Sequence, residues 1–182
     1  MKDTLNLGIK GFVEFYLNGK FESRHNLVVS NCRRILRDLV YNARVTENDD
    51  NSVKEEFPNP PTISHLVLGD MGLTLSEAQA GVPEASVDDK KLVNPQLWVP
   101  VSDPTNYPQN KKEAIVYQGN KAIQYTFVLA KDQGNSSGFF CELGLAINNT
   151  TNPDDYLFTK MNRLPIIKTS SDELTLIYSL IF

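Results

Sequence analysis

The sequence predicts a mainly β protein, an antiparallel β-sandwich with one amphipathic α-helix near the N-terminus at about residues 31–42. Short apolar segments separated by turn residues recur through the last third of the chain, which is typical of a sandwich. Only one segment places its apolar residues at the spacing of a helix face. No strands and helices alternate as they do in parallel βαβ units, so we expect an antiparallel sheet.

Length and composition favour a single domain spanning residues 1–182. Of the 182 residues, 41% are hydrophobic and 22% are charged, as in an ordinary globular protein. A chain of this length can bury a core without disulfides or metal ions. Two polar stretches, at about 45–61 and 102–112, are expected to be insertions in this domain.

Residues 8–24 contain the first predicted element, a β-hairpin. Apolar residues such as Val13 and Phe15 alternate with polar ones until Asn18 and Gly19 follow. Asn-Gly accepts the positive φ angles of a type I′ turn, which is the turn that joins two hairpin strands most closely.

The predicted helix at about 31–42 follows the hairpin. Its apolar residues fall at positions i, i+3, i+4, i+7 and i+8 and so form one stripe: Cys32, Ile35, Leu36, Leu39 and Val40. The opposite face is polar, and Ser30 or Asn31 can cap the start. We expect this helix to cover part of the sheet.

The middle of the chain is less regular. Residues 43–62 are expected to be a polar loop, 62–68 a short strand, and 76–89 a loop of small and acidic residues. Residues 92–102 are expected to be extended, but Pro95 and Pro100 restrict them to an edge or irregular strand because proline cannot donate to a ladder.

The last third is predicted to be strand after strand. The strands expected here span residues 123–129, 139–147, 156–161, 164–169 and 173–182, with Asn162 as a turn between the third and fourth. The final strand is apolar on both faces, which predicts a central position in the sheet or a cover formed by another copy of the chain.

Charge excludes one class of partner. The net charge is −4 and the isoelectric point about 5.2, whereas nucleic-acid binders need a basic patch. No apolar run is long enough to span a membrane. Cys32 and Cys141 are interpreted as small buried hydrophobic residues, since neither lies in a metal-ligand or redox spacing with the other or with a histidine.

The stretch from Gly69 to Gly72 resembles the start of a phosphate site. A P-loop needs a lysine after its second glycine, and a dinucleotide fingerprint needs a third glycine inside a βαβ unit. Neither is present, so we interpret this stretch as a corner. Gly69 or Gly72 is expected to have a positive φ, with Asp70 exposed.

No catalytic, cofactor or metal site is assigned, and the protein is expected not to be an enzyme. Four carboxylates could pair or bind a calcium ion instead of being solvated: Asp70 with Glu77, or Asp88 with Asp89. His65 is interpreted as a structural histidine rather than a base. Trp98 and Tyr107 are interpreted as buried or interface anchors, with a sugar-stacking platform as the alternative. Asn135 and Asn148 begin glycosylation sequons, which are frequent by chance.

The order of motifs along the chain resembles tailed-bacteriophage tail proteins. The motifs are "HNLVVSNCRRILRDLV" (25–40), "ISHLVLGDMG" (63–72), "DDKKLVN" (88–94), "FFCELGLAI" (139–147) and "LFTKMNRLPIIKTSSDELTLIYSLIF" (157–182). In order, they resemble the structural proteins of tail fibres and of baseplates or fibre adaptors. The glycine turn at Gly69–Gly72 is one residue longer than in that pattern, and the two polar insertions do not belong to it.

This resemblance implies a β-sandwich virion component, made in the host bacterial cytoplasm and located in the phage tail. It implies assembly with other tail proteins and with copies of itself, as a trimer or around a six-fold tail, and it implies no catalytic residue. The alternative is a receptor- or carbohydrate-binding module of a tail fibre.

Overall fold

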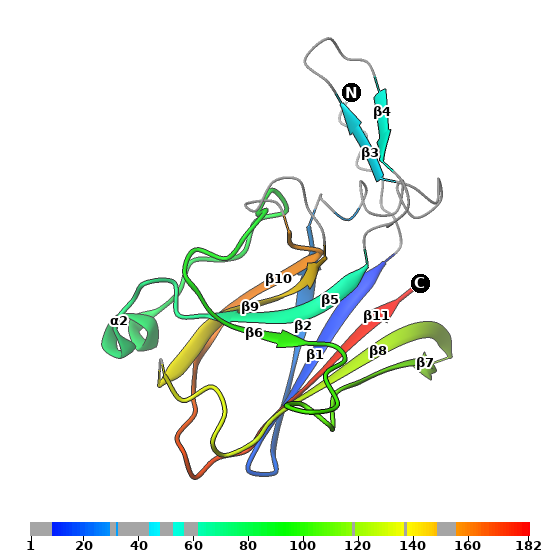
Figure 1. Cartoon of the computed structure of the whole chain (residues 1–182). Helices are drawn as coiled ribbons and strands as arrows, with labels where there is room; N and C mark the ends of the chain where they lie inside the picture. Colours follow the sequence, from blue (N-terminus) through cyan, green and yellow to red (C-terminus); the bar gives the residue numbers. More distant parts are fainter. Residues whose placement is uncertain are drawn as a thin grey trace.

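The computed structural model describes residues 9–29, 32, 44–47, 53–56, 62–117, 119–136, 138–148 and 156–182, and it is mainly β (Figure 1). One antiparallel sheet has the strand order β6-β5-β9-β10-β2-β1-β11-β8-β7. Its strands are β1 (Lys10–Leu17), β2 (Lys20–Val28), β5 (Ile63–Gly69), β6 (Pro95–Pro100), β7 (Lys111–Tyr117), β8 (Asn120–Leu129), β9 (Phe139–Ile147), β10 (Thr159–Ile167) and β11 (Leu174–Ile181). The prediction of a mainly β, antiparallel protein is confirmed.

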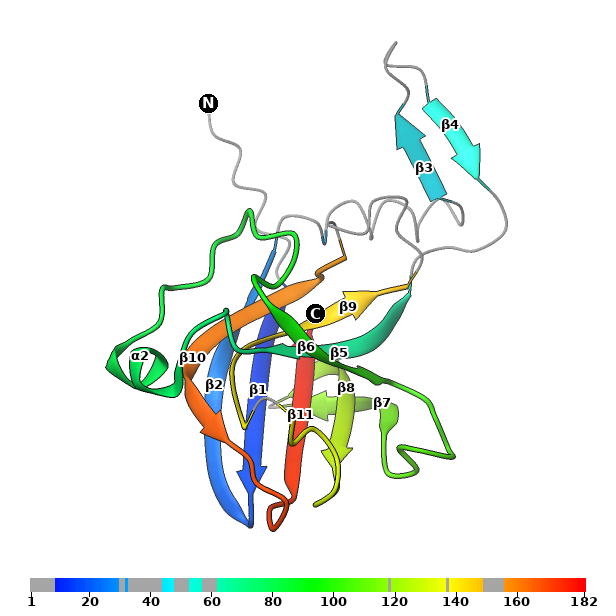
Figure 2. The same cartoon turned by 60° about the vertical axis from the view of Figure 1, so that its left-hand side comes forward.

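The sheet folds over so that its two halves share one core. Strands β5 and β6 run across the direction of β1 and β11 in both views (Figures 1 and 2). The main core takes buried side chains from both halves, among them Val13, Phe15, Leu66, Leu68, Phe127, Phe140, Leu143, Leu176 and Tyr178. The halves meet where β10 pairs with β2, and that ladder has only two residue pairs, Thr159 with Val28 and Lys160 with Leu27.

The predicted hairpin is confirmed. Strands β1 and β2 pair from Gly11 with Asn26 to Leu17 with Lys20. Asn18 and Gly19 have φ angles of 49° and 78°, the positive values that a type I′ turn requires.

The positions of two further strands agree with the sequence. Strand β6 lies at the edge of the sheet, as its two prolines predict. Strand β11 lies between β1 and β8, so the strand that is apolar on both faces is central. The predicted helix at 31–42 lies outside the described residues except for Cys32, which is buried in the main core.

Other elements correct the sequence interpretation. The polar segment 43–62 contains a separate two-stranded antiparallel sheet of β3 (Arg44–Glu47) and β4 (Val53–Glu56), which stands away from the nine-stranded sheet in Figure 1. The stretch expected to be a loop contains α2 (Leu75–Ala80). This helix begins with a capping box, in which Thr74 and Glu77 satisfy each other's backbone N–H groups.

The last two corrections concern strands. Residues 111–117 form the edge strand β7, whose first two residues were expected to belong to the insertion at 102–112. The segments expected as two strands on either side of Asn162 form one strand, β10, whose register with β9 shifts between Asn162 and Ile166. A strand can continue through such an irregularity because pairing resumes beyond it.

The segment before β7 is fastened by side chains. Asp103 Oδ1 accepts hydrogen bonds from the backbone N–H groups of Thr105 and Asn106, both at 3.0 Å. Asn110 joins β6 to β8, because its amide donates to the Pro100 carbonyl at 2.7 Å and accepts from Val128 N at 2.8 Å. This polar stretch is therefore an ordered connection.

Strand β9 is buried along its whole length, with β5 on one side and β10 on the other. Gly144 allows β10 to approach, since a β-carbon there would overlap the carbonyl oxygen of Thr159 and the side chain of Leu157. The φ angle of Gly144 is not positive, so close packing alone requires glycine.

We predict that Gly144→Ala destabilises the protein by about 1–3 kcal/mol, because the added methyl group must displace backbone in a packed interior. The free energy of unfolding is measured by urea denaturation. Ala114→Ser on the exposed face of β7 is the control and should change it by less than about 0.5 kcal/mol. Equal stability of the two variants would contradict close packing at Gly144.

Candidate functional site

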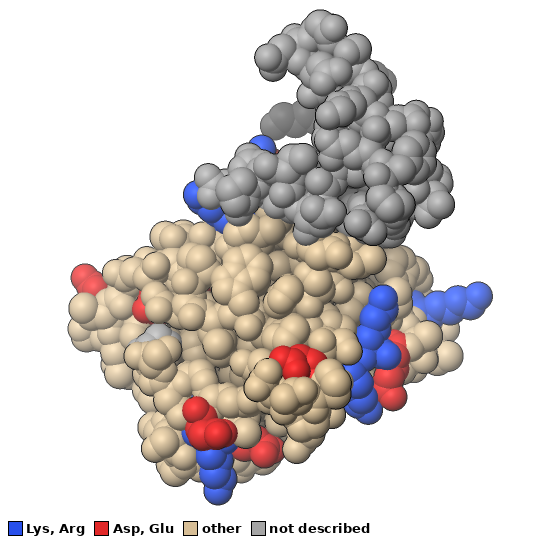
Figure 3. Space-filling model, in the orientation of Figure 1, with Lys and Arg blue, Asp and Glu red and all other residues tan. Residues whose placement is uncertain are grey.

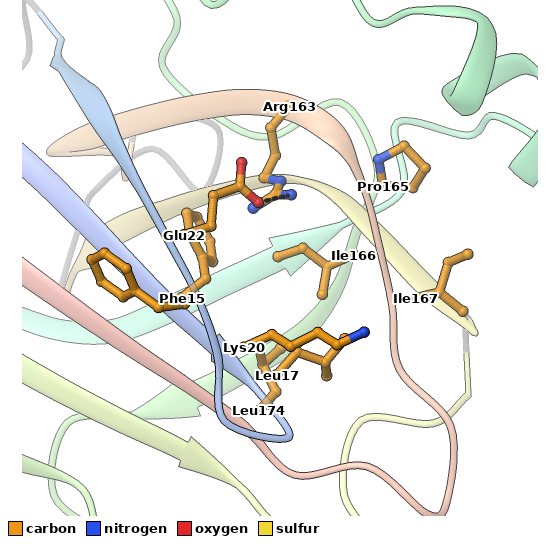
Figure 4. Close-up of a pocket in the computed structure, with 10 residues that line it drawn as sticks. Phe15, Leu17, Lys20, Glu22, Arg163, Pro165, Ile166, Ile167 and Leu174 are labelled. Carbon is orange, nitrogen blue, oxygen red and sulfur yellow. Dashed lines mark hydrogen bonds and ion pairs between the residues drawn. The ribbon is translucent and has the colours of Figure 1, made fainter.

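A groove opens where β2 and β10 separate, and we call it the β2–β10 groove (Figure 4). It has a volume of about 350 Å³ and is lined by Phe15, Leu17, Lys20, Phe21, Glu22, Arg163, Pro165, Ile166, Ile167 and Leu174. Phe15, Ile166 and Leu174 belong to the main core, so the floor of the groove is apolar and continuous with the interior.

The course of β10 explains why the groove exists. Beyond Lys160, no residue of β10 pairs with β2 in the described part of the chain. Strand β10 instead stays with β9, where pairing resumes at Ile166 after the register shift. Pro165 lies within this irregular stretch and has no N–H to donate to a ladder.

An ion pair crosses one end of the groove. Arg163 Nη2 lies 2.9 Å from Glu22 Oε2, and Arg24 Nη2 lies 2.7 Å from Glu22 Oε1. The Arg163 guanidinium also lies over the Phe15 ring, 4.5 Å from its centroid. Figure 4 shows the Arg163 and Glu22 side chains extended toward each other from the two strands. Side chains thus join β2 and β10 where their backbones no longer do.

Burial and the neighbouring charges act in opposite directions on the pKa values of Glu22 and Arg163. Burial raises the pKa of Glu22, but hydrogen bonds and charges from Arg24 and Arg163 outweigh it and leave the pKa lowered. Burial lowers the pKa of Arg163, and Glu22 opposes that shift. Both groups are charged at neutral pH, so this end of the groove holds two cations and one anion.

The other end of the groove carries Lys20. No hydrogen bond or ion pair joins its amine to a described residue. Among the lining residues, Ile167 is 41% exposed, while the exposed ring of Phe21 packs beside Tyr16 on the opposite face of β2. The groove is therefore an apolar hollow beside an ammonium group that has no partner in the described part of the chain.

The tip of the β1–β2 hairpin is fastened beside the groove to the turn between β10 and β11. Asn18 Nδ2 donates to Asp172 Oδ1, and Asn18 N donates to the Glu173 carbonyl at 3.2 Å. Asp172 Oδ2 accepts from Thr169 N at 2.8 Å and from Thr169 Oγ1 at 2.6 Å. The Thr169 and Asn18 hydrogen bonds lower the pKa of Asp172 to about 2.

The corner at Gly69–Gly72 is confirmed as a turn with a positive φ, 70° at Gly72 and 60° at Met71. The expectation that Asp70 is exposed was wrong, because it is half-buried. Asp70 Oδ1 accepts from Gly72 N at 2.9 Å and from Asn94 Nδ2 at 2.8 Å. Its carboxylate stabilises the corner and attaches it to the segment before β6.

The other candidate carboxylates are dispersed. Glu77 belongs to the α2 capping box, and the Thr74 hydroxyl and backbone lower its pKa. Asp89 forms an ion pair with Lys160 at 3.2 Å, while Asp88 is exposed. In the described part of the chain, no three His, Cys, Asp or Glu residues are grouped so as to hold a metal ion.

Sequence reasoning missed a buried charged cluster around Glu142. This fully buried carboxylate accepts hydrogen bonds from Val93 N at 2.8 Å and Asn94 N at 2.7 Å. Lys160 Nζ lies 3.7 Å from it and 3.2 Å from Asp89. A glutamate inside the apolar strand "FFCELGLAI" was the available signal. The cluster fixes the segment 89–94 on the sheet.

Trp98 and Tyr107 do not form the alternative sugar-stacking platform. Trp98 is 42% exposed, and its ring contacts His65 at 5.9 Å and Tyr156 at 4.8 Å between centroids. Its neighbours in β6 face the main core, and Tyr107 packs against that core. The two aromatic rings therefore lie on different sides of β6.

His65 has one hydrogen-bond partner among the described residues, Ser64 Oγ at 2.8 Å from Nδ1. Burial lowers the pKa of His65, which keeps the ring neutral at physiological pH. No carboxylate within the described residues orients this ring. The Ser64–His65 contact therefore lacks the third group of a triad.

The two cysteines are buried in the fold, and the two sequon asparagines accept hydrogen bonds within it. Cys32 and Cys141 are both buried, as predicted, and burial followed by the charges of Glu142 and Asp70 raises the pKa of Cys141 to about 11. Asn135 Oδ1 accepts from the buried Lys168 Nζ at 2.9 Å. Burial lowers the pKa of Lys168, so this hydrogen bond supports an amine that is costly to bury. Asn148 Oδ1 accepts from Thr62 N at 2.7 Å.

The face in Figure 3 is mostly uncharged, with Lys, Arg, Asp and Glu in a few small groups that include both signs. This distribution offers no basic stripe for a nucleic-acid backbone on that face. None of the described helices is long and apolar enough to cross a membrane. Comparison with protein-family models, curated proteins and solved structures finds no match for this chain.

We predict that Glu142→Gln destabilises the protein by about 3 kcal/mol. The glutamine leaves the buried Lys160 ammonium group without the negative charge of Glu142, and it has one acceptor oxygen for the two backbone N–H groups that the carboxylate binds. Urea denaturation measures the change. Glu113→Gln removes the exposed ion pair with Lys111 and should cost less than about 1 kcal/mol. Similar losses in both variants would contradict a structural role for the buried charge.

We predict that Asp172 contributes stability that is present above pH 3.8 and is lost as the pH falls toward about 2, since its pKa is depressed in the folded state. Thermal unfolding across this range should show a shallower acid dependence for Asp172→Asn than for the wild type. Asp88→Asn is the control, because the Asp88 side chain accepts no hydrogen bond from a described residue. Parallel profiles for the wild type and Asp172→Asn would refute the assignment.

Proposed function

We propose that this protein is a virion structural component of a bacteriophage tail, a baseplate or tail-fibre adaptor part that acts by oligomeric assembly. The proposal combines the order of sequence motifs with a mainly β structure. It includes the finer fold class, a β-sandwich whose two layers are the halves of the folded sheet around the shared core.

The observation that carries this proposal is the apolar surface around the β2–β10 groove. Its floor of Phe15, Leu17, Ile166 and Leu174 continues into the core, and Ile167, which is 41% exposed, belongs to its lining. An apolar groove that opens at the surface is typical of a binding or protein–protein contact site. Assembly requires surfaces of this kind rather than perturbed acids or bases.

The use of polar groups supports the same proposal. The carboxylates considered for catalysis or metal binding stabilise a turn, cap a helix or pair with a lysine. His65 packs against Trp98, and its one hydrogen-bond partner among the described residues is the Ser64 hydroxyl. We therefore propose a protein that acts through its surface and not as an enzyme.

The carbohydrate-binding alternative loses its specific support. It required Trp98 and Tyr107 on one surface, and they lie on different sides of β6. Trp98 is half-exposed beside Tyr156, which suits the role of an anchor in a protein–protein interface.

We predict that the protein is present in purified phage particles at a copy number that is a multiple of three or six. Quantitative mass spectrometry against a major tail-tube protein measures this ratio, and light scattering measures the oligomeric state of the purified full chain. Absence of the chain from purified particles would refute the proposed function. A monomeric chain that binds glycans or cells would favour the receptor-binding alternative.

A further inference from the structure

We propose that the β2–β10 groove binds an extended segment of a partner protein, which inserts one apolar side chain between the strands and pairs a carboxylate with Lys20. Naming that partner as another tail protein rests on the proposed function. The groove itself, its charge and its backbone geometry are independent of that identification.

The hollow fits an apolar side chain. Its floor consists of Phe15, Leu17, Ile166 and Leu174, and its volume of about 350 Å³ has room for a large side chain. The exposed Ile167 lines the groove on the β10 side, and on the β2 side Phe21 contributes its backbone, because its ring lies beside Tyr16 on the opposite face of the sheet. A side chain inserted here would be enclosed by apolar surface, which is how an interface anchor gains most of its binding energy.

The wall formed by β2 can hydrogen-bond to an extended backbone. In a two-residue hairpin, the pair next to the turn exchanges its hydrogen bonds, and this pair is Leu17 with Lys20. The following pair, Tyr16 with Phe21, is therefore non-hydrogen-bonded, and the N–H and C=O of Phe21 point away from β1. No described residue forms a hydrogen bond with these two groups. They offer a segment the hydrogen bonds of an added strand.

The two outer edges of the sheet are less suitable for strand addition. Strand β6 has a proline at each end, Pro95 and Pro100, and prolines remove donors from that edge. Strand β7 begins with Lys111 and Lys112, and charged side chains oppose pairing along an edge. Strand β2 contains no proline, and beside the groove it has apolar surface next to its unpaired backbone.

Charge favours an acidic segment. Lys20 and Arg163 line the groove, whereas Glu22 is the one carboxylate among its lining residues and already pairs with Arg163 and with Arg24 beside it. The site is thus cationic on a chain whose net charge is −4. Lys20 has no partner among the described residues, so a carboxylate of the segment would complete the charge pairing.

The test uses a fluorescein-labelled peptide, Thr-Val-Thr-Leu-Thr-Asp-Thr, and fluorescence anisotropy with the full chain. Leu and Asp are two positions apart and so face the same side of an extended strand. We expect saturable binding, weakened about tenfold or more by Ile167→Glu and by Lys20→Glu. Val116→Glu and Lys121→Glu, exposed on β7 and β8, are matched controls and should bind like the wild type.

A charge exchange separates recognition from damage to the fold. A second peptide with Lys in place of Asp should bind the wild type weakly and should regain affinity for Lys20→Glu. Thermal unfolding of each variant confirms that it is folded. If Lys20→Glu merely disturbed the hairpin, the peptide with Lys would not regain affinity for this variant.

Three outcomes would overturn the proposal. They are the absence of saturable peptide binding up to millimolar concentration, equal binding by Ile167→Glu and wild type, and saturable binding of dodecanoate where the peptide does not bind, which would indicate a site for a small amphiphile. Loss of self-association in Ile167→Glu would assign the groove to a second copy instead. The copy number in purified particles tests the proposed function separately, so the two proposals can fail independently.

Discussion

The short ladder between β2 and β10 is the constraint on which the rest of the structure depends. Two residue pairs keep the nine strands in one sheet, yet they leave the two halves able to turn across each other and enclose a common core. A longer ladder would hold β10 parallel to the plane of β2 and leave the apolar faces of β5 and β9 without a cover. The β2–β10 groove is the geometric result of this early separation.

The short β2–β10 ladder also determines where charges are buried. Lys160 pairs with Leu27 in the ladder, and its buried ammonium group contacts Glu142 and Asp89. The segment 89–94 is thereby attached to the sheet at the position where the two halves meet. Beyond this ladder, where β2 and β10 separate, Arg163 and Glu22 connect the two strands through their side chains. At Lys160 the ionic contacts add to the backbone pairing, and at Arg163 they connect two strands that no longer pair.

The parts of the fold that depend on local chemistry could be predicted from the sequence. Asn18-Gly19 specifies the hairpin turn, the prolines of β6 specify an edge, and an apolar pattern on both faces specifies a central β11. Helix α2 was missed because six residues are too few to show a helical period, although its capping box is visible in the sequence. Strand β10 was divided in two because a register shift depends on its partner β9 and not on its own residues. The groove could not be predicted, since Glu22 and Arg163 meet only after β2 and β10 have paired and separated.

The central position of β11 has a consequence for how the chain folds. Strand β11 pairs with β1 on one side and β8 on the other, so Lys10 lies opposite Ile181 across a ladder that joins distant parts of the sequence. Among the described strands, β8 joins the sheet by pairing with β11, and β7 joins it by pairing with β8. Contacts between residues so far apart carry a large loop-closure entropy, and such topologies fold slowly. Until β11 inserts, β1 and β8 each present an unpaired edge, so this interval is the stage at which the chain is most exposed to aggregation.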